Sequence, residues 1–312
     1  MAPASAVSDS EKTPSWQGHY VMDTLKAPSR LAAGLYIVAT PIGNLEDITL
    51  RALHVLRDAE FILAEDTRHT RKLLTYFGLS SRLYSFHEHN EHEKESQVLE
   101  RVRGGAAVAL VSDAGVPAVS DPGAKLVAGA VAQGLTVVPV PGPSAVLAAL
   151  VASGIACDTF QFVGFLHAKQ GQRQKQLKRL AGNPATLIFF IPPHGLASVL
   201  ADMASAFGEG RRCVIARELT KVHEQFHRGK LGDLAGEVKA VPLKGEVTVV
   251  VEGAVSSEAA SLIDDTALQE HLMELIRAGV QPSQAARLVS KLLNLPKGQV
   301  YDMAVRIASQ EL

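Results

Sequence analysis

Short apolar runs alternate with helical segments along most of this 312-residue chain. Residues 107–111 form an apolar run with no polar alternation, which is typical of a strand covered on both faces of a parallel sheet. Similar runs begin near 35, 61 and 135, and further strand candidates lie at 160–165, 185–191, 212–217 and 247–252. We therefore expect an α/β fold with mainly parallel strands in the first half, while the order and direction of the later strands stay open.

The four runs of the first half each end in a loop of small or reactive residues. After 107–111, Ser112, Asp113 and Gly115 expose backbone, and Ser-Asp-Pro at 120–122 offers an N-cap and a proline for the next helix. Open α/β sheets bind their ligands beyond the carboxyl ends of their strands. An ordinary strand-to-helix turn would explain one such loop, but four junctions of this kind indicate one shared pocket.

Helical periodicity completes the predicted organisation. Helices are expected at 144–153 and, with Asn90 as its cap, at 91–103. The tail contains three helical patterns, joined as tightly as in a helix-turn-helix, at 268–278, 283–293 and 296–308. The predicted parts are a disordered N-terminal extension at 1–33, an α/β domain at 34–142, a second α/β domain at 143–255 and a helical tail at 264–312.

Composition narrows the class of protein. Hydrophobic residues make up 47% of the chain, which is enough to bury two cores. Cys157 and Cys213 lie far apart, which argues against a disulfide framework or a zinc site. The sequence has no apolar run of membrane-spanning length, no hydrophobic signal core before residue 30, and neither the phosphate-loop nor the dinucleotide-binding glycine motif. We expect a cytoplasmic enzyme without metal or membrane contact.

Six segments occur in the order and spacing of one known family. They are VATPIGNLEDIT from Val38, EDTRHTRKLL from Glu65, HEHNE from His87, SDAGVPAVSDPG from Ser112, VPVPGPSA from Val138 and ARELTKVHE from Ala216. Together they resemble the ribosomal RNA small-subunit methyltransferase I family, part of the tetrapyrrole methylase superfamily of S-adenosylmethionine (AdoMet) enzymes. The resemblance runs from about Gly34 to Gly253 and implies two α/β domains with AdoMet in the cleft between them.

By this resemblance, the AdoMet pocket takes residues from several motifs. They are Pro41, Ser112, Asp113, Ala114, Gly115, Val116, Pro117, Ser144, Ala145, Leu219 and Thr248. Small residues let the backbone approach the ligand closely, and Asp113 can accept from a hydroxyl or ammonium group. Tight-turn geometry alone would also explain the glycines and prolines.

Two segments separate the chain from its wider superfamily. The first loop reads TPIGN at 40–44, where tetrapyrrole-modifying relatives carry glycine-proline-glycine, and this favours the RNA branch. IPPHG at 191–195 stands where relatives carry a Glu-Ser-Pro-His-Arg type of sequence. We therefore assign His194 no catalytic role, and any substrate contact made by that motif in relatives is in doubt here.

Methyl transfer to a ribose 2′-hydroxyl requires the protein to position the oxygen and remove its proton. Glu65 and Asp66 are candidates for the base or the hydroxyl orienter, and Arg68 could lower their pKa or hold phosphate. A helix N-cap with a local ion pair is the competing interpretation of this trio. A second candidate group, near the expected cofactor rim, consists of Glu218, Lys221 and His223.

The histidine-rich run at 87–92 does not have the spacing of a metal site, because position 91 is Glu and the H-E-x-x-H pattern is broken. We interpret most of this run as the solvated start of a helix. The family resemblance makes a place for His87 or His89 in the substrate pocket more plausible than metal binding.

Charge distribution indicates where RNA could bind. The formal net charge is only −1, so the chain is no general polycation. No Asp or Glu occurs between Asp158 and Asp202, and the basic residues there include Lys169, Arg173, Lys175, Lys178 and Arg179. A second basic stretch spans 211–230. Such patches supply phosphate contacts to RNA, although a solvated helix face explains the first cluster almost as well.

The resemblance therefore predicts an AdoMet-dependent 2′-O-methyltransferase acting on a cytidine of 16S ribosomal RNA, within the small subunit. One alternative is a tetrapyrrole carbon methyltransferase. Another is a noncatalytic nucleic-acid-binding regulator that uses the helical tail. The resemblance also implies a homodimer, for which the apolar segments 137–151 and 160–165 offer surface.

Overall fold

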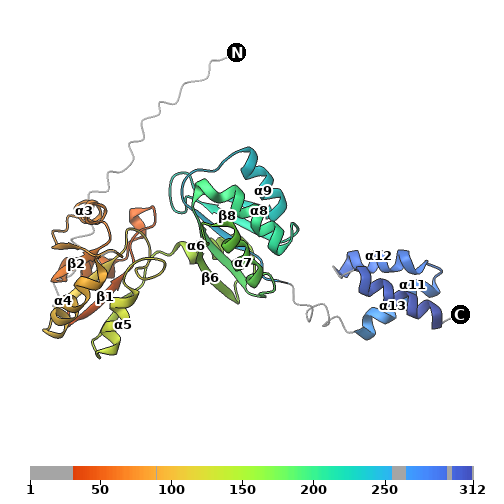
Figure 1. Ribbon diagram of the computed structural model, residues 1–312, viewed down its shortest axis with the longest axis horizontal. Coiled ribbons are helices and arrows are strands. Elements are labelled where there is room, and N and C mark those ends of the chain that lie inside the picture. The colour runs from red at the N-terminus through yellow and green to blue at the C-terminus, as the bar shows by residue number, and fades with distance from the viewer. Residues whose placement is uncertain (1–30, 89, 255–264, 294–296, 311–312) are drawn as a thin grey trace, which may run out of the picture.

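The computed structural model describes residues 31–88, 90–254, 265–293 and 297–310. These residues form two five-stranded sheets with helices packed on them, followed by a helical tail (Figure 1). The predicted α/β class is therefore confirmed. The extension predicted at 1–33 lies almost wholly outside the described residues.

The first sheet is entirely parallel, with the strand order β3-β2-β4-β1-β5. Its strands are β1 (Gly34–Val38), β2 (Phe61–Ala64), β3 (Leu83–Ser85), β4 (Ala107–Val111) and β5 (Val137–Val140). Its helices are the 3-10 turn η1 (Leu45–Asp47), α2 (Leu50–Asp58), α3 (Thr67–Tyr76), α4 (Glu91–Arg103) and α5 (Ala124–Ala132). The central strands β2 and β4 are buried at every position because helices cover both faces.

Each face of the first sheet has its own apolar core. Leu53 of α2 and Leu73 of α3 pack on one face, and Leu99 of α4 and Leu126 of α5 pack on the other. Helix α2 begins after Thr49, whose side chain accepts from the backbone N–H of Ala52. This doubly covered arrangement leaves the carboxyl ends of the strands as the open edge of the domain.

Helix α5 begins later than its sequence predicts. The Ser-Asp-Pro segment at 120–122 was expected to cap it, but α5 starts at Ala124 after Gly123. The chain instead turns through left-handed conformations at Ala118 and Ser120, whose φ angles are 67° and 65°. The capping prediction is therefore wrong. Asp121 does not cap α5, because the helix begins after Gly123.

The second sheet is mixed, with the order β6-β7-β10-β8-β9. Its strands are β6 (Phe160–Phe165), β7 (Thr186–Ile191), β8 (Arg212–Arg217), β9 (Gln225–Lys230) and β10 (Val247–Val251). Only β6 and β7 pair in parallel, and the other neighbours are antiparallel. Its helices are α6 (Ala145–Ser153), α7 (Gln170–Leu180), the 3-10 turn η2 (Pro193–Gly195), α8 (Leu196–Phe207) and α9 (Leu231–Ala240).

The two faces of the second sheet have different neighbours. Helices α7, α8 and α9 cover one face through Leu177, Leu200 and Leu234. Helix α6 covers the other face, where Leu150 packs with Ile188 of β7. In Figure 1 this helix lies at the junction of the two domains. The face covered by α6 is therefore the one that meets the first domain.

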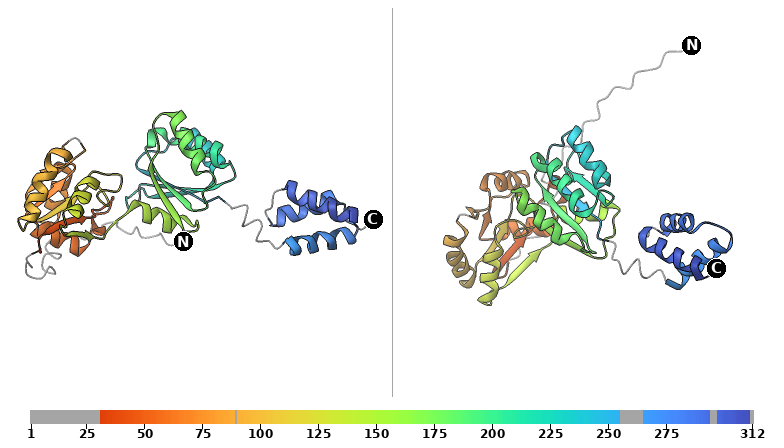
Figure 2. Two further views of the ribbon diagram at one scale, coloured as in Figure 1. Left: turned by 60° about the horizontal axis from the view of Figure 1, so that its bottom comes forward. Right: turned by 45° about the vertical axis from the view of Figure 1, so that its right-hand side comes forward.

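The tail forms a bundle of its own (Figure 2). Its helices are α11 (Asp265–Arg277), α12 (Pro282–Leu293) and α13 (Lys297–Gln310). They meet through fully buried Leu272, Ala285 and Ala304. The predicted helical tail is confirmed, with ends shifted by a few residues. None of the helices in the described ranges is long and apolar enough to cross a membrane.

Candidate functional site

A cavity of about 590 Å³ opens at the carboxyl edge of the first sheet. The loops that follow β1, β2, β4 and β5 each contribute to its wall, through Ile42, Glu65, Asp113 and Ser144. These loops are distant in sequence, but they meet here because parallel strands end at the same edge of a sheet. The four junctions expected to share one pocket do so.

The opposite wall comes from the second domain and is largely aromatic. Phe162, Phe165 and Phe190 line it, together with Thr248 of β10. Phe162 and Phe165 each meet Phe190 edge to face, with ring centroids 4.9 and 5.6 Å apart. A register shift between Phe162 and Gly164 brings residues three apart on β6 to the same side of the strand. The cavity therefore lies between the two domains.

The first two loops hold each other in place. Thr40 and Gly115 exchange backbone hydrogen bonds of 2.9 and 3.0 Å, and the Thr40 hydroxyl donates to the Ser112 carbonyl at 3.2 Å. Gly115 has a φ of 79°, which a side chain would strain. Because its N–H and carbonyl are both used by Thr40, Gly115 shapes the loop rather than offering these groups to a ligand.

The first loop also joins the second domain. The Asn44 N–H donates to the Thr220 hydroxyl at 3.0 Å. A Cβ on Gly43 would lie only 2.5 Å from the Lys221 side chain, so this contact needs glycine. Leu219 is buried in one core with Ile42, behind the cavity. These contacts fix the first loop against the second domain where both bound the cavity.

Three carboxylates face the cavity from the first domain: Glu65, Asp113 and Asp121. Burial, followed by the charges of Asp121 and Asp113, raises the pKa of Glu65, and a backbone hydrogen bond from Asp113 only partly opposes this. Burial and the charge of Asp113 also raise the pKa of Asp121, against a hydrogen bond from Ser112. The wall therefore favours a bound cation or a retained proton.

The trio Glu65, Asp66 and Arg68 is divided by the structure. Asp66 is the N-cap of α3, and its carboxylate accepts from the Arg68 backbone at 2.8 Å and from its guanidinium at 2.9 Å. These bonds lower the pKa of Asp66 to about 2. Only Glu65 lines the cavity. Asp66 and Arg68 thus have the geometry of a cap with a local ion pair.

The residues that the family resemblance predicts to bind AdoMet fall into two groups. Those lining the cavity are Asp113, Ala114, Gly115, Val116, Ser144, Ala145 and Thr248. Those outside its lining are Pro41, Ser112, Pro117 and Leu219. Sequence reasoning missed Asp121, although it stands in a quoted motif, and missed the aromatic wall. Pro192 and Pro193, from the segment that departs from its relatives, also line the cavity.

The basic cluster expected to bind RNA lies on α7, and four of its five members are exposed. Arg173 is the exception, with 7% of its surface exposed. Its guanidinium contacts the Asp202 carboxylate at 2.6 and 2.7 Å, inside the contact of α7 with α8. Helix α7 packs on the face of the second sheet that points away from the cavity. The exposed members, Lys169, Lys175, Lys178 and Arg179, are therefore remote from the cavity.

The second candidate group is also divided. Lys221 contacts the Glu218 carboxylate at 2.9 Å and the Glu246 carboxylate at 3.1 Å. Glu246 lines the cavity, whereas Glu218, Lys221 and His223 do not. Glu218 and Thr220 have φ angles of 52° and 64°, so this turn is held in an unusual conformation at the domain junction.

The fold and the site define a two-domain α/β protein with a ligand pocket between its domains. Residues 34–235 match the family model of Tetrapyrrole (Corrin/Porphyrin) Methylases, which is this class of protein. The protein named ribosomal RNA small subunit methyltransferase I from Synechocystis sp. is 41% identical over 88% of this chain and 98% of its own length. The protein of the same name from Mesorhizobium japonicum is 46% identical over 88% and 92%. The chain belongs to this family and is a methyltransferase.

A solved structure supports the fold. Uroporphyrin-III C-methyltransferase from Thermus thermophilus, complexed with S-adenyl homocysteine, superposes with a TM-score of 0.51 at 19% identity. The match covers 70% of this chain and 97% of that one. The two-domain arrangement is therefore shared beyond the ribosomal RNA branch.

Proposed function

We propose that the protein transfers a methyl group from AdoMet to the ribose 2′-hydroxyl of a cytidine in 16S ribosomal RNA. The observation that carries this proposal is the cavity between the domains, with carboxylates on one wall and aromatic rings on the other. The names of the relatives support ribosomal RNA as the acceptor. The solved uroporphyrin-III methyltransferase, which is complexed with S-adenyl homocysteine, supports AdoMet as the methyl donor.

The two walls fit the two ends of AdoMet. The molecule carries a positive sulfonium and an ammonium group, and Asp113 and Asp121 supply negative charge on the first wall. The adenine is flat and largely apolar, which suits Phe162 and Phe190. Backbone N–H groups at the start of α6, beside Ser144, suit the carboxylate. When bound, AdoMet supplies the electrophilic methyl group.

We assign Glu65 as the general base that removes the proton of the acceptor 2′-hydroxyl. A 2′-hydroxyl must lose its proton as the new bond forms, and a general base works best when its pKa lies near the working pH. Burial and two neighbouring carboxylates move the pKa of Glu65 upward, toward that range. Asp66 and Arg68 then act through Glu65, because they fix the start of α3 immediately after it.

The wider assembly is also part of the proposal. We place the reaction in the cytoplasm, on the small ribosomal subunit, with Lys169, Lys175, Lys178 and Arg179 as outer phosphate contacts. A homodimer is supported by two exposed apolar side chains outside the cavity lining, Val151 of α6 and Phe160 of β6, which are 74% and 42% exposed. Light scattering should report about twice the 33.2 kDa chain mass, and a monomer that methylates normally would exclude the dimer.

The decisive test uses small subunits from a strain that lacks the enzyme. Purified protein and isotopically labelled AdoMet should place the label in 2′-O-methylcytidine, identified by nucleoside mass spectrometry. Label in a methylated base, or label accepted by a uroporphyrinoid and not by the subunits, would refute the proposal. If calorimetry shows no AdoMet binding, both methyltransferase functions are excluded, and the noncatalytic nucleic-acid-binding regulator is the alternative that remains.

A further inference from the structure

Helix α3 carries a basic stripe on its exposed side. The stripe consists of Arg68, Arg71, Lys72, Thr75 and Tyr76, which together with Thr67 line one shallow groove. Their spacing of three and four residues puts them on one face of the helix. The opposite face, with Leu73 and Leu74, is buried in the core of the first domain. The stripe is therefore the exposed face of α3.

The charge of this surface is unbalanced. The sequence contains no Asp or Glu between Asp66 and Glu88, so no acidic side chain follows along α3 or β3. Arg68 has Asp66 as its partner, but Arg71 and Lys72 are exposed and take part in no ion pair with a described residue. A positive helix face without internal partners fits a negatively charged ligand.

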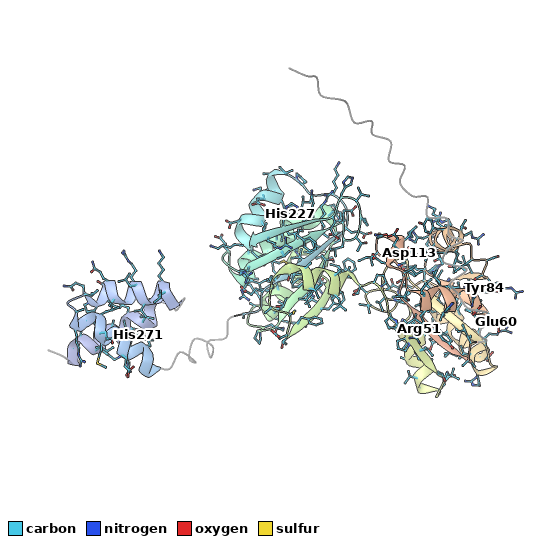
Figure 3. The ribbon with its side chains drawn as sticks, turned by 180° about the vertical axis from the view of Figure 1, so that it is seen from behind. Arg51, Glu60, Tyr84, Asp113, His227 and His271 are labelled. Atoms are coloured by element: carbon cyan, nitrogen blue, oxygen red, sulfur yellow. The ribbon has the colours of Figure 1, made fainter. Side chains whose placement is uncertain are left out.

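The position of the stripe relates it to the reaction. Helix α3 begins two residues after Glu65, and Asp66 donates its backbone N–H to Asp113 at 3.0 Å. Asp113 lies on the side of the first domain that faces the second (Figure 3). A helix of 10 residues is about 15 Å long, so the stripe leads from the cavity wall outward over the length of a few nucleotides. The α7 cluster, in contrast, lies behind the second sheet.

Tyr76 ends the stripe with an aromatic ring. It is 46% exposed, and its ring meets Phe77 edge to face with centroids 4.9 Å apart. Phe77 is buried, so the exposed Tyr76 ring lies directly beside a ring of the core. Proteins that bind single-stranded RNA combine basic groups, which contact phosphates, with exposed aromatic rings, on which bases stack.

We propose that the basic stripe of α3 binds the single-stranded RNA that flanks the target nucleotide, with phosphates on Arg71 and Lys72 and a base stacked on Tyr76. This proposal rests on the proposed function, since it takes the acceptor to be RNA. It places the principal substrate contact on the first domain, next to Glu65. The α7 cluster then supplies at most a distant contact.

The electrostatic part is tested by direct RNA binding of the full chain. The double variant Arg71→Gln/Lys72→Gln keeps good helix formers and removes two charges. In filter binding to a single-stranded 16S fragment across a salt series, its log-log salt slope should fall by about 1.4, roughly 0.7 for each phosphate contact. The matched control, Lys239→Gln/Lys244→Gln, removes two exposed charges of the second domain and should leave the slope unchanged. The swap Arg71→Lys/Lys72→Arg should retain it.

The stacking part uses a pair of tyrosines. Tyr76→Ala should weaken RNA binding by roughly tenfold at every salt concentration, without a change of slope. Tyr84 is a matched control, because it is 52% exposed and also meets a core ring, Phe61, edge to face at 5.2 Å. In Figure 3 it lies on the outer side of the first domain, away from Asp113. Tyr84→Ala should bind RNA like the unmodified protein.

The outcomes separate this proposal from the proposed function. Equal salt slopes for the α3 double variant and its control would overturn the proposal that the stripe binds RNA. Methylation by the unmodified protein would be unaffected by that result. A loss of AdoMet affinity in the α3 double variant would also overturn the proposal, because the stripe should not touch the cofactor. Normal RNA binding without any methyl transfer would instead refute the proposed function alone.

Discussion

Arg173 provides a sharp test of which basic residues serve RNA and which serve the fold. Sequence alone groups it with four other cations of α7, yet its guanidinium pairs with Asp202 between α7 and α8, and the two side chains are 9% and 6% exposed. The other carboxylate oxygen of Asp202 accepts from Gln174 at 2.9 Å and from Gln170 at 3.2 Å. Arg173→Gln therefore removes the only cation that faces this buried carboxylate among the described residues.

The expected cost follows from the burial. Removing one partner of a buried ion pair leaves an uncompensated charge and costs about 3 to 5 kcal/mol of unfolding free energy. For a domain of about 110 residues, that corresponds to a melting temperature lowered by roughly 13 to 22 °C. Burial would raise the pKa of Asp202, but hydrogen bonds from Gln174, Arg173 and Gln170 outweigh it and hold that pKa below its usual value. The stabilisation is therefore present above the unfolded pKa of the carboxyl and is lost as pH falls through the lower, folded value.

Thermal unfolding followed by circular dichroism measures the effect. Lys178→Gln, an exposed change on the same helix, should alter stability by less than about 0.5 kcal/mol. Arg173→Met combined with Asp202→Leu should recover much of the loss, because an apolar pair replaces the buried charges. If Arg173→Gln melts within about 2 °C of the unmodified protein and lowers the RNA salt slope, Arg173 is a phosphate contact and the structural argument fails.

Four further outcomes are expected. Gly115→Val should abolish AdoMet binding in a folded protein, since φ is 79° in the loop that meets Thr40, and calorimetry showing unchanged affinity would remove this loop from the cofactor site. Glu65→Gln should lower the methylation rate at saturating AdoMet by about 10² to 10⁴, and an unchanged rate would exclude Glu65 as the base. Because the pKa of Glu65 is raised, the methylation rate of the unmodified enzyme should rise with pH as this carboxyl loses its proton. The pH–rate profile of the Gln variant should lack this rise. Replacing Lys169, Lys175, Lys178 and Arg179 with Gln should lower the RNA salt slope by about 0.7 for each true phosphate contact, and an unaltered slope would show that the cluster is only solvated.

The sequence predicts the parts of the fold that depend on burial. Strands β2 and β4 are continuous apolar runs because helices cover both of their faces, and they were found where expected. The edge strands β3 and β9 were not predicted, since most of their residues are partly or fully exposed and their sequences lack an apolar run. The antiparallel pairing of the second sheet also leaves no mark in local spacing, because it is set by long-range contacts.

The candidate site could likewise be predicted only in part from the sequence. The carboxyl-edge loops could be predicted, since parallel strands bring the residues that follow them to one edge. The aromatic wall could not, because Phe162 and Phe165 share a side of β6 only through the register shift at Gly164, where φ is 76°. Asp121 was missed because its neighbours have the composition of a helix cap, and only the left-handed turn at Ser120 directs it to the cavity.

The raised pKa values of Glu65 and Asp121 connect cofactor binding with the chemistry of the site. Burial, together with repulsion from the neighbouring carboxylates on this wall, raises the pKa of Glu65 and of Asp121. A positive sulfonium beside this wall favours the ionised forms, and by linkage the protonated wall disfavours the cation to the same extent. With the cation bound, a larger fraction of Glu65 is ionised and can accept the acceptor proton, although each carboxylate is a somewhat weaker base than at the higher pKa. The same reasoning explains why Asp113 and Asp121 belong to this wall even though neither needs to touch the acceptor oxygen.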